Sequence, residues 1–446
     1  MRHPKFEIHP GARASLNEIA LLVLKGASDF EPQPKNGQFQ TQRHIGLSLT
    51  DADLVGDTQL WHCDIFGRSS AVSFSNGSLT HTIKDEDYQR LRQLVDRVFK
   101  LPWSNRFVGP AFVENCIIEW CRHRLKNPSA ENEFCDALVF DCEKAVKQYV
   151  VWVPIAHLEV AKPFGFGPVK IEVISKPMID THTSIILARG SQEGVSVQQY
   201  IDRIRDDLQG LAAVVVRVEA EKDRAVARAI ELSDVAVGLL RFFSLAALTP
   251  WHTCPCDILG SEYIPRSTAL VMTENVSVFS IDKRIRKNFS PWQMTDEQLQ
   301  DFQQRGFSEA ASLLNDSLTQ FQMTVRSSLL AYGKGTTLPD LNDRMVYTFS
   351  ALENLLLKDT NEPIQQNLAE RMAFMLFQDS GARRDIVRNI KEIYHLRSQY
   401  IHHRVAAAEE QLLESFIENA RFTLERASNG SIRSTLSRSS WKQLIG

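Results

Sequence analysis

The sequence lacks an apolar run long enough to cross a bilayer. Its most apolar segment, Leu239–Trp251, contains an arginine and a proline and falls short of the ~20 residues that a membrane helix needs. The first residues, MRHPKFEIHPGARASLNE, contain no apolar core of signal-peptide length. The sequence therefore predicts a cytoplasmic protein with no membrane partner.

The sequence also lacks a disulfide framework and a strong net charge. Its 7 cysteines are odd in number and irregularly spaced, which favours a reducing compartment. The net charge is only -3, so any nucleic-acid site has to be a local basic patch. The length of 446 residues, of which 43% are hydrophobic and 24% charged, is typical of a globular protein with two or three domains.

The N-terminal region, residues 1–147, has a mixed pattern. Apolar and polar residues alternate at 44–54 and 69–83, which predicts strands. Apolar residues lie three and four apart at 85–101 and 112–126, which predicts helices. We therefore expect a mixed α/β region here.

Residues 148–295 change to a period of two and predict an α+β, β-rich regulatory or sensor domain. The expected strands are 148–160, 168–175, 183–189 and 211–220. The first two are expected to form a pair joined by the Gly/Pro turn at 161–167. A helix is expected near 197–208, and a long Ala/Leu-rich helix is expected to end at about Leu248.

Residues 296–430 follow a helical pattern almost throughout, with breaks at YGKGTTLPD, KDTNEP and QDSGARRD. Roughly five helices with short connections are the pattern of a bundle. The Ser-rich end, 431–446, predicts a flexible tail. The expected fold class is α+β, with a mixed N-terminal α+β region before a C-terminal all-α helical bundle.

An arginine lies in the middle of an apolar stripe near the C-terminus. Stepping the expected helix 385–405 at ~100° per residue places Arg397 inside the apolar sector and His402 at its edge. A buried arginine is costly unless it is paired. Glu353 lies inside the apolar sector of the expected helix 343–358, so the sequence predicts an Arg397–Glu353 ion pair between two helices.

The segment around Arg397 is a local basic patch. It contains Arg383, Arg384, Arg388, Lys391, Arg397 and Arg404, together with His395, His402 and His403. Arginine can hold a phosphate with two donors, and histidine can move protons near neutral pH. A base for the ribose 2′-OH and a cation at the phosphate are enough to cleave RNA without a metal, whereas DNA lacks the 2′-OH.

The C-terminal region, about residues 296–430, resembles the HEPN superfamily and, within it, the Apea-like branch. The matching segments are LENLLL at 352–357, the NEP that begins the next helix, LAERMAFML at 368–376 and IYHLRSQYIHH at 393–403. HEPN domains are small helical bundles, and in many of them an R-x4-6-H motif from two protomers forms a metal-independent RNase site. The resemblance implies an endoribonuclease acting on RNA, with tRNA as one candidate, as a homodimer or higher homo-oligomer.

By this resemblance, Arg397 would bind the scissile phosphate and His402 would act as general base or acid. The supporting residues would be Glu353, Asn354, Ser398 and Tyr400. The residues binding RNA phosphates would be Arg388, Lys391, His403 and Arg404. Families of this kind often act in bacterial defence against phage or as toxin-like effectors, and the N-terminal region would then sense an unknown trigger ligand.

A second interpretation belongs to a different class of protein. In it the bundle is a non-catalytic dimerisation or nucleic-acid-binding module, and the Arg397–Glu353 pair only fixes the register of its helices. Neither interpretation calls for a metal or a cofactor. His252, Cys254 and Cys256 lie close in sequence, but their spacing is not that of a zinc finger.

Overall fold

The computed structural model describes residues 6–29, 59–63, 67, 69–75, 79–129, 132–189, 194–261, 266–272, 279–285, 291–357, 362–403 and 410–433. The chain forms two compact units. Unit 1 consists of residues 1–149 and 218–228, and unit 2 consists of residues 150–217 and 229–446. The three-domain division with limits at 147, 295 and 430 stays a prediction.

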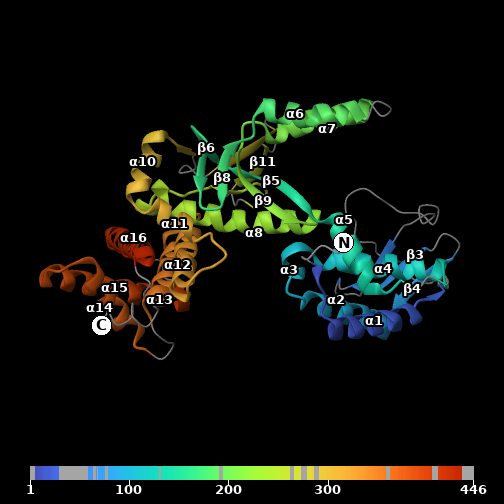
Figure 1. The fold of residues 1–446 in the computed structure, drawn as a ribbon. Coiled ribbons are helices and arrows are strands. Elements are labelled where there is room, and N and C mark those ends of the chain that lie inside the picture. Colours follow the sequence, from blue (N-terminus) through green and yellow to red (C-terminus); the bar gives the residue numbers. More distant parts are fainter. Residues whose placement is uncertain are drawn as a thin grey trace. The chain divides into compact units, whose positions relative to one another are not determined.

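Unit 1 combines a four-stranded antiparallel sheet with packed helices (Figure 1). The sheet has the order β1-β4-β3-β2, with β1 (Ser28–Asp29), β2 (Gln59–Cys63), β3 (Ser69–Ser75) and β4 (Thr80–Lys84). The helices are α1 (Pro10–Lys25), α2 (Asp85–Phe99), α3 (Ser104–Phe107), α4 (Pro110–Lys126) and α5 (Phe134–Ala145). Apolar residues three and four apart on α2 are buried together with Val72, Phe74 and Ile83 of the sheet.

The patterns expected in unit 1 are confirmed where the structure describes them. The alternation at 69–83 forms β3 and β4, and the helical spacing at 85–101 and 112–126 forms α2 and α4. The strand expected at 44–54 lies outside the described residues.

Unit 2 begins with a five-stranded sheet of order β10-β5-β9-β8-β7. Its strands are β5 (Lys147–Ala156), β7 (Phe164–Phe166), β8 (Val169–Val173), β9 (Ala212–Ala220) and β10 (Asp257–Ile258). Two further strand pairs are the parallel pair β6 (Leu158–Val160) and β13 (Trp292–Met294) and the antiparallel pair β11 (Arg266–Met272) and β12 (Phe279–Ile285). The division between the units falls inside β5, β9 and α8 (Lys222–Leu240).

The pairing expected between 148–160 and 168–175 is wrong. The segment expected as a turn contains β7, which pairs with β8 across a turn at Gly167, while β5 lies between β9 and β10. Gly167 has a positive φ of 60°, and a side chain there would collide with the backbone carbonyl of Ala311. The turn therefore depends on a close approach from a helix far along the chain, which local patterning does not reveal.

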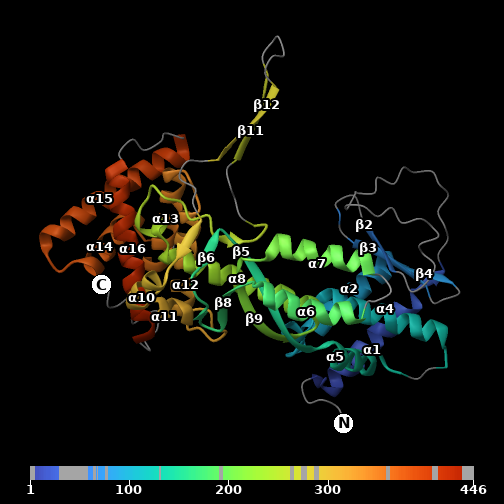
Figure 2. The same ribbon diagram turned by 90° about the horizontal axis from the view of Figure 1, so that it is seen from above.

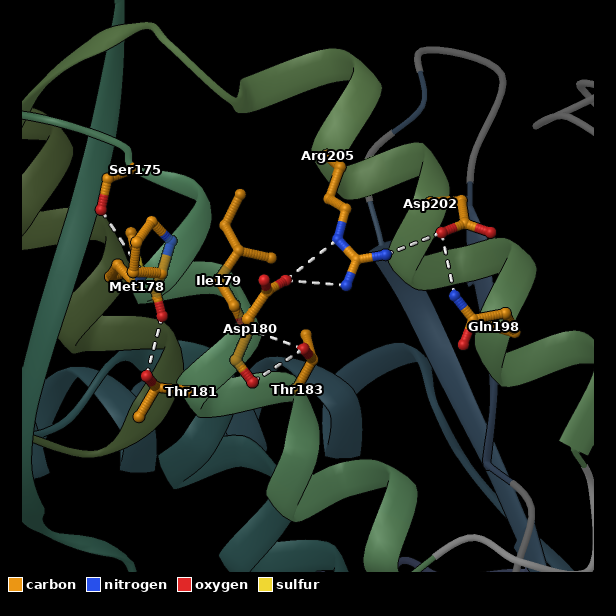
Figure 3. Close-up of polar contacts among 10 residues, drawn as sticks. Ser175, Met178, Ile179, Asp180, Thr181, Thr183, Gln198, Asp202 and Arg205 are labelled. Atoms are coloured by element: carbon orange, nitrogen blue, oxygen red, sulfur yellow. Dashed lines mark hydrogen bonds and ion pairs between the residues drawn. The ribbon is translucent and has the colours of Figure 1, made fainter.

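The strand expected at 183–189 is also wrong, because these residues end helix α6 (Lys176–Arg189). Helix α7 (Gly194–Leu208) packs beside it, as Figures 1 and 2 both show. In Figure 3, the Thr183 hydroxyl donates to the carbonyl of Ile179, and Arg205 of α7 bridges to Asp180 of α6 at 2.7 Å. Packing between the two helices overrides the β-propensity of this β-branched run.

Helix α8 ends earlier than expected. It stops at Leu240, and one turn of 3₁₀-helix at Arg241–Phe243 and the short α9 (Leu245–Leu248) follow it. From Thr295 onward the described residues form seven helices rather than about five, because the short α10 (Asp296–Gln304) and α11 (Phe307–Ser312) precede the longer ones.

The five longer helices of unit 2 pack against one another near the C-terminus (Figure 1). They are α12 (Gln320–Thr336), α13 (Leu341–Leu356), α14 (Ile364–Leu376), α15 (Ser380–His403) and α16 (Glu410–Arg433). Helix α16 therefore includes the first residues of the tail expected to be flexible, and residues 434–446 lie outside the described part of the chain. With sheets in the N-terminal half and helices in the C-terminal part, the fold class is α+β.

Three buried arginines connect α13, α16 and the segment that follows α8. Arg241 forms an ion pair with Asp257 at 2.7 Å, and Arg421 forms one with Glu425 at 2.6 Å. Arg344 is 1% exposed and forms no ion pair with any described residue. Its guanidinium instead donates to the backbone carbonyls of Ala246, Thr249, Pro250 and His252. Arg344 thereby fixes the segment 246–252 to helix α13.

Replacing Arg344 with methionine removes all four of these hydrogen bonds and leaves buried carbonyls without donors. We expect Arg344→Met to lower the free energy of unfolding by about 4 kcal/mol. Urea unfolding measures this change. Arg203→Met, at an exposed position on α7, is the matched control and should change stability by less than ~0.5 kcal/mol. Equal effects of the two substitutions would contradict the structural role of Arg344.

Candidate active site

The predicted Arg397–Glu353 ion pair is present between α15 and α13. Nη1 of Arg397 lies 2.8 Å from Oε1 of Glu353, and Nη2 lies 3.5 Å from Oε2. The two side chains are 18% and 21% exposed, so the pair lies partly in water rather than in the core. The arrangement is a two-pronged contact between a guanidinium and a carboxylate, which fixes the plane of the arginine head.

Two aromatic rings also contact the Arg397 head. Its guanidinium carbon lies 5.2 Å from the ring centre of Phe349 and 5.6 Å from that of Tyr394. These cation–π contacts partly replace the water that the charge has lost. The Nε atom of Arg397 is nevertheless buried and has no hydrogen-bond partner among the described residues. A buried donor of this kind is uncommon in folded proteins.

The pKa of Glu353 is raised because the side chain is half-buried, and the nearby Arg397 opposes this rise. The ionised carboxylate therefore costs free energy in the folded state, and the arginine offsets part of that cost. The pair is consequently stabilising mainly because each partner would otherwise be left charged and poorly solvated.

A hollow of about 230 Å³ lies beside Arg397 along one face of α15. Its lining residues recur at helical spacing and are Tyr394, Arg397, Ser398, Ile401 and His402. The structure thus brings three of the predicted site residues together. His402 is exposed and has no hydrogen-bond partner among the described residues, so both ring nitrogens are available for proton transfer.

Two of the predicted supporting residues make contacts outside this hollow. The Tyr400 hydroxyl donates to Asp343 at 2.7 Å and so ties the end of α15 to the start of α13. The Asn354 amide donates to the Ser328 hydroxyl of α12 at 3.1 Å. One helical step of ~100° separates Asn354 from Glu353 and turns it toward a different neighbour.

Two of the predicted phosphate-binding residues, Arg388 and Lys391, belong to a longer exposed row along α15. The row consists of Arg384, Arg388, Lys391, His395, Ser398 and His402, at alternating steps of four and three residues. Arg388 forms an ion pair with Asp385 at 2.5 Å, whereas Arg384 and Lys391 form none within the described ranges. His403 is exposed but lies ~100° round the helix from His402, and Arg404 lies outside the described residues.

Arg383 is engaged in structure rather than available to a ligand. Its guanidinium lies 4.1 Å from the ring centre of Phe374, and its Nε donates to the carbonyl of Phe377 at 2.7 Å. It therefore closes the connection between α14 and α15. The sequence patterns did not single out the aromatic wall of Phe349 and Tyr394, since aromatic residues at helical spacing usually indicate only a core.

The thiols near His252 face each other. Cys254 and Cys256 are fully buried, and a hydrogen bond between their sulfur atoms lowers the pKa of Cys254 and raises that of Cys256. His252 instead contacts the Thr249 hydroxyl at 3.0 Å.

In the part of the chain that the structure describes, no group of three histidine, cysteine or acidic side chains is placed to hold a metal ion. Nor is any described helix both long and apolar enough to span a membrane.

Comparison with protein-family models, with curated proteins and with solved structures finds no match to this chain. The resemblance of the C-terminal region to HEPN domains therefore stays a prediction from its motifs.

Removing Arg397 should destabilise the protein in a pH-dependent way. Arg397→Ala leaves Glu353 half-buried without its cation, so the pKa of Glu353 should rise further. A carboxyl with a raised folded-state pKa loses stability as pH increases from its unfolded pKa to its folded pKa. The loss relative to the parent should therefore be small near pH 4 and reach about 1–2 kcal/mol at pH 7.

Urea unfolding across this pH range measures the effect. The double variant Arg397→Ala/Glu353→Gln is the control, because it removes the ionisable group and should flatten the pH dependence. A stability loss of the same size at pH 4 and pH 7 would contradict the assigned cause.

Proposed function

We propose that the chain is a metal-independent endoribonuclease whose site is the hollow on α15. The observation that carries the proposal is that Arg397, with a buried and unpartnered Nε, shares this hollow with the exposed His402. An arginine donor for a phosphate and a histidine that can take the proton of the 2′-OH are two of the groups that metal-independent RNA cleavage requires. The exposed cations Arg384, Arg388 and Lys391 extend from this hollow along α15 and supply attraction for an RNA backbone.

The proposed reaction begins with attack of a ribose 2′-oxygen on the adjacent phosphorus. The new bond to phosphorus forms as the bond to the 5′-oxygen breaks, giving a 2′,3′-cyclic phosphate and a 5′-hydroxyl. His402 takes the proton of the 2′-OH, and Arg397 stabilises the charge that grows on the phosphate oxygens.

The leaving 5′-oxygen needs a second proton donor. A single His402 cannot accept one proton and donate another at the same moment, so the proposal includes a homodimer in which a second copy of this site supplies the acid. The 7 cysteines are all free thiols, which supports a reducing, cytoplasmic location for this activity.

The alternative, a non-catalytic binding or dimerisation module, is favoured by one specific observation. Arg397 already has a well-formed carboxylate partner, so its charge is accounted for without any ligand. If the protein is such a module, substituting His402 would not change RNA cleavage. The His402→Ala variant therefore distinguishes the two proposals.

His402→Ala should abolish cleavage of RNA while leaving stability nearly unchanged, because His402 is exposed and outside the core. The assay incubates the full chain with total tRNA and with single-stranded RNA in EDTA, and identifies the ends of the products. His123→Ala, which removes an exposed histidine of α4, is the matched control and should cleave like the parent. Products with 2′,3′-cyclic phosphate ends from the His402→Ala variant would exclude His402 as the catalytic residue.

The row on α15 should set the salt dependence of RNA binding. In an Arg384→Ala/Lys391→Ala double variant, the slope of log affinity against log salt for single-stranded RNA should fall by about 1.4, since each phosphate contact contributes roughly 0.7. Fluorescence anisotropy with labelled RNA, in the His402→Ala background, measures this slope. Arg203→Ala/Lys100→Ala removes the same charge at exposed positions away from α15 and should leave the slope unchanged.

A further inference from the structure

Unit 1 contains a hollow of about 630 Å³ on residues that the proposed ribonuclease chemistry does not use. Helix α4 contributes one face of it, with Phe112, Asn115, Cys116 and Glu119 at helical spacing. The rest comes from the end of α5, the first residues of β5 and the start of α8. This volume lies within the range of ordinary small-molecule sites.

The acidic residues of this hollow are already engaged. Glu221 accepts hydrogen bonds from three backbone N–H groups, those of Gly109, Asp223 and Arg224, at 3.1, 2.7 and 2.8 Å. Glu119 pairs with Arg122 at 2.5 Å. The third acid, Asp141, is half-buried; its burial raises its pKa, and the thiol of Cys116 donates to it. Each of the three carboxylates therefore has a hydrogen-bond or ion-pair partner other than the lysines of the hollow.

Three exposed lysines supply the cations of the hollow, and one of them, Lys144, interacts electrostatically with Asp141. Lys144, Lys147 and Lys222 are exposed, and none of them forms an ion pair with another residue that the structure describes. They come from three different elements and meet at one hollow. Three exposed ammonium groups that meet at one hollow favour an anionic ligand with several oxygen atoms.

The remaining lining is apolar and aromatic. Phe112, Ala145 and Tyr149 are partly buried around the hollow. Tyr149 and Lys147 lie two residues apart on β5 and so point to the same side of the strand. An aromatic side chain next to a lysine offers a stacking surface for a flat ring close to a site for its phosphate.

We propose that this hollow binds a nucleoside phosphate. The base lies against Phe112 and Tyr149, and the phosphate oxygens contact Lys144, Lys147 and Lys222. The exposed amide of Asn115 can donate to and accept from the edge of a base. The site is independent of the proposed ribonuclease activity, since all of its residues belong to unit 1.

The test is calorimetric titration of the full chain with ADP, adenosine and inorganic phosphate as separate probes. ADP should bind with a dissociation constant in the micromolar range and at least tenfold more tightly than adenosine or phosphate alone. Lys144→Ala and Lys222→Ala should each weaken ADP binding about tenfold, and Tyr149→Ala should remove the advantage of ADP over phosphate. Lys100→Ala, an exposed lysine of unit 1 outside the hollow, is the control and should bind ADP like the parent.

Three results would overturn the proposal. They are no detectable binding of ADP at millimolar concentration, phosphate binding as tightly as ADP, and equal weakening by Lys144→Ala and Lys100→Ala. Because none of these variants changes the α15 hollow, RNA cleavage by them stays a separate measurement, and the two proposals can fail independently.

Discussion

The packing of unit 2 depends on the hydrogen-bond acceptors that its buried guanidinium groups find in the protein. A guanidinium that leaves water needs acceptors for its donors, and an unpaired one costs several kcal/mol. Arg344 donates hydrogen bonds to four backbone carbonyls, and Arg241 and Arg421 form ion pairs with nearby carboxylates. Two of these arginines join segments distant in sequence, because Arg344 reaches carbonyls almost a hundred positions earlier in the chain and Nε of Arg421 donates to the carbonyl of Phe242. The positions of these acceptors therefore decide how the bundle meets the segment that follows α8.

Arg397 meets this need for acceptors only in part. Glu353 and two aromatic rings accommodate its charge, but one buried donor remains without a partner, and the Glu353 carboxylate is itself destabilised by burial. A phosphate that entered the hollow would have to bind Arg397 through its terminal nitrogens, since Nε is buried. As it moved closer, its higher charge would compete with Glu353 for the two terminal nitrogens. A half-buried pair of this kind can thus be structural in the free protein and still yield its arginine to a substrate.

Much of the candidate site could be predicted from sequence because it depends on helical spacing. The Arg397–Glu353 pair follows from two polar residues inside apolar sectors of neighbouring helices, and the shared hollow of Arg397, Ser398 and His402 follows from their separation on one helix. Asn354 contacts Ser328 of α12 because adjacent residues on a helix face different neighbours. The turn at Gly167 and the helical state of 183–189 depend on contacts with Ala311 and with α7, which no local pattern encodes. Predictions failed where tertiary contacts override local preference.

The two proposed sites differ in how they present positive charge, and this difference determines their chemistry. In unit 1 the lysines are exposed, so they can bind an anion directly, but salt screens them strongly. In the α15 hollow the arginine is only 18% exposed and already paired, so an anion must compete for it, but the interaction is screened less once formed. The first arrangement suits reversible binding of a small ligand whose concentration varies. The second suits a site where charge must be stabilised as it develops during a reaction, because a positioned, poorly hydrated cation needs little reorganisation at that moment.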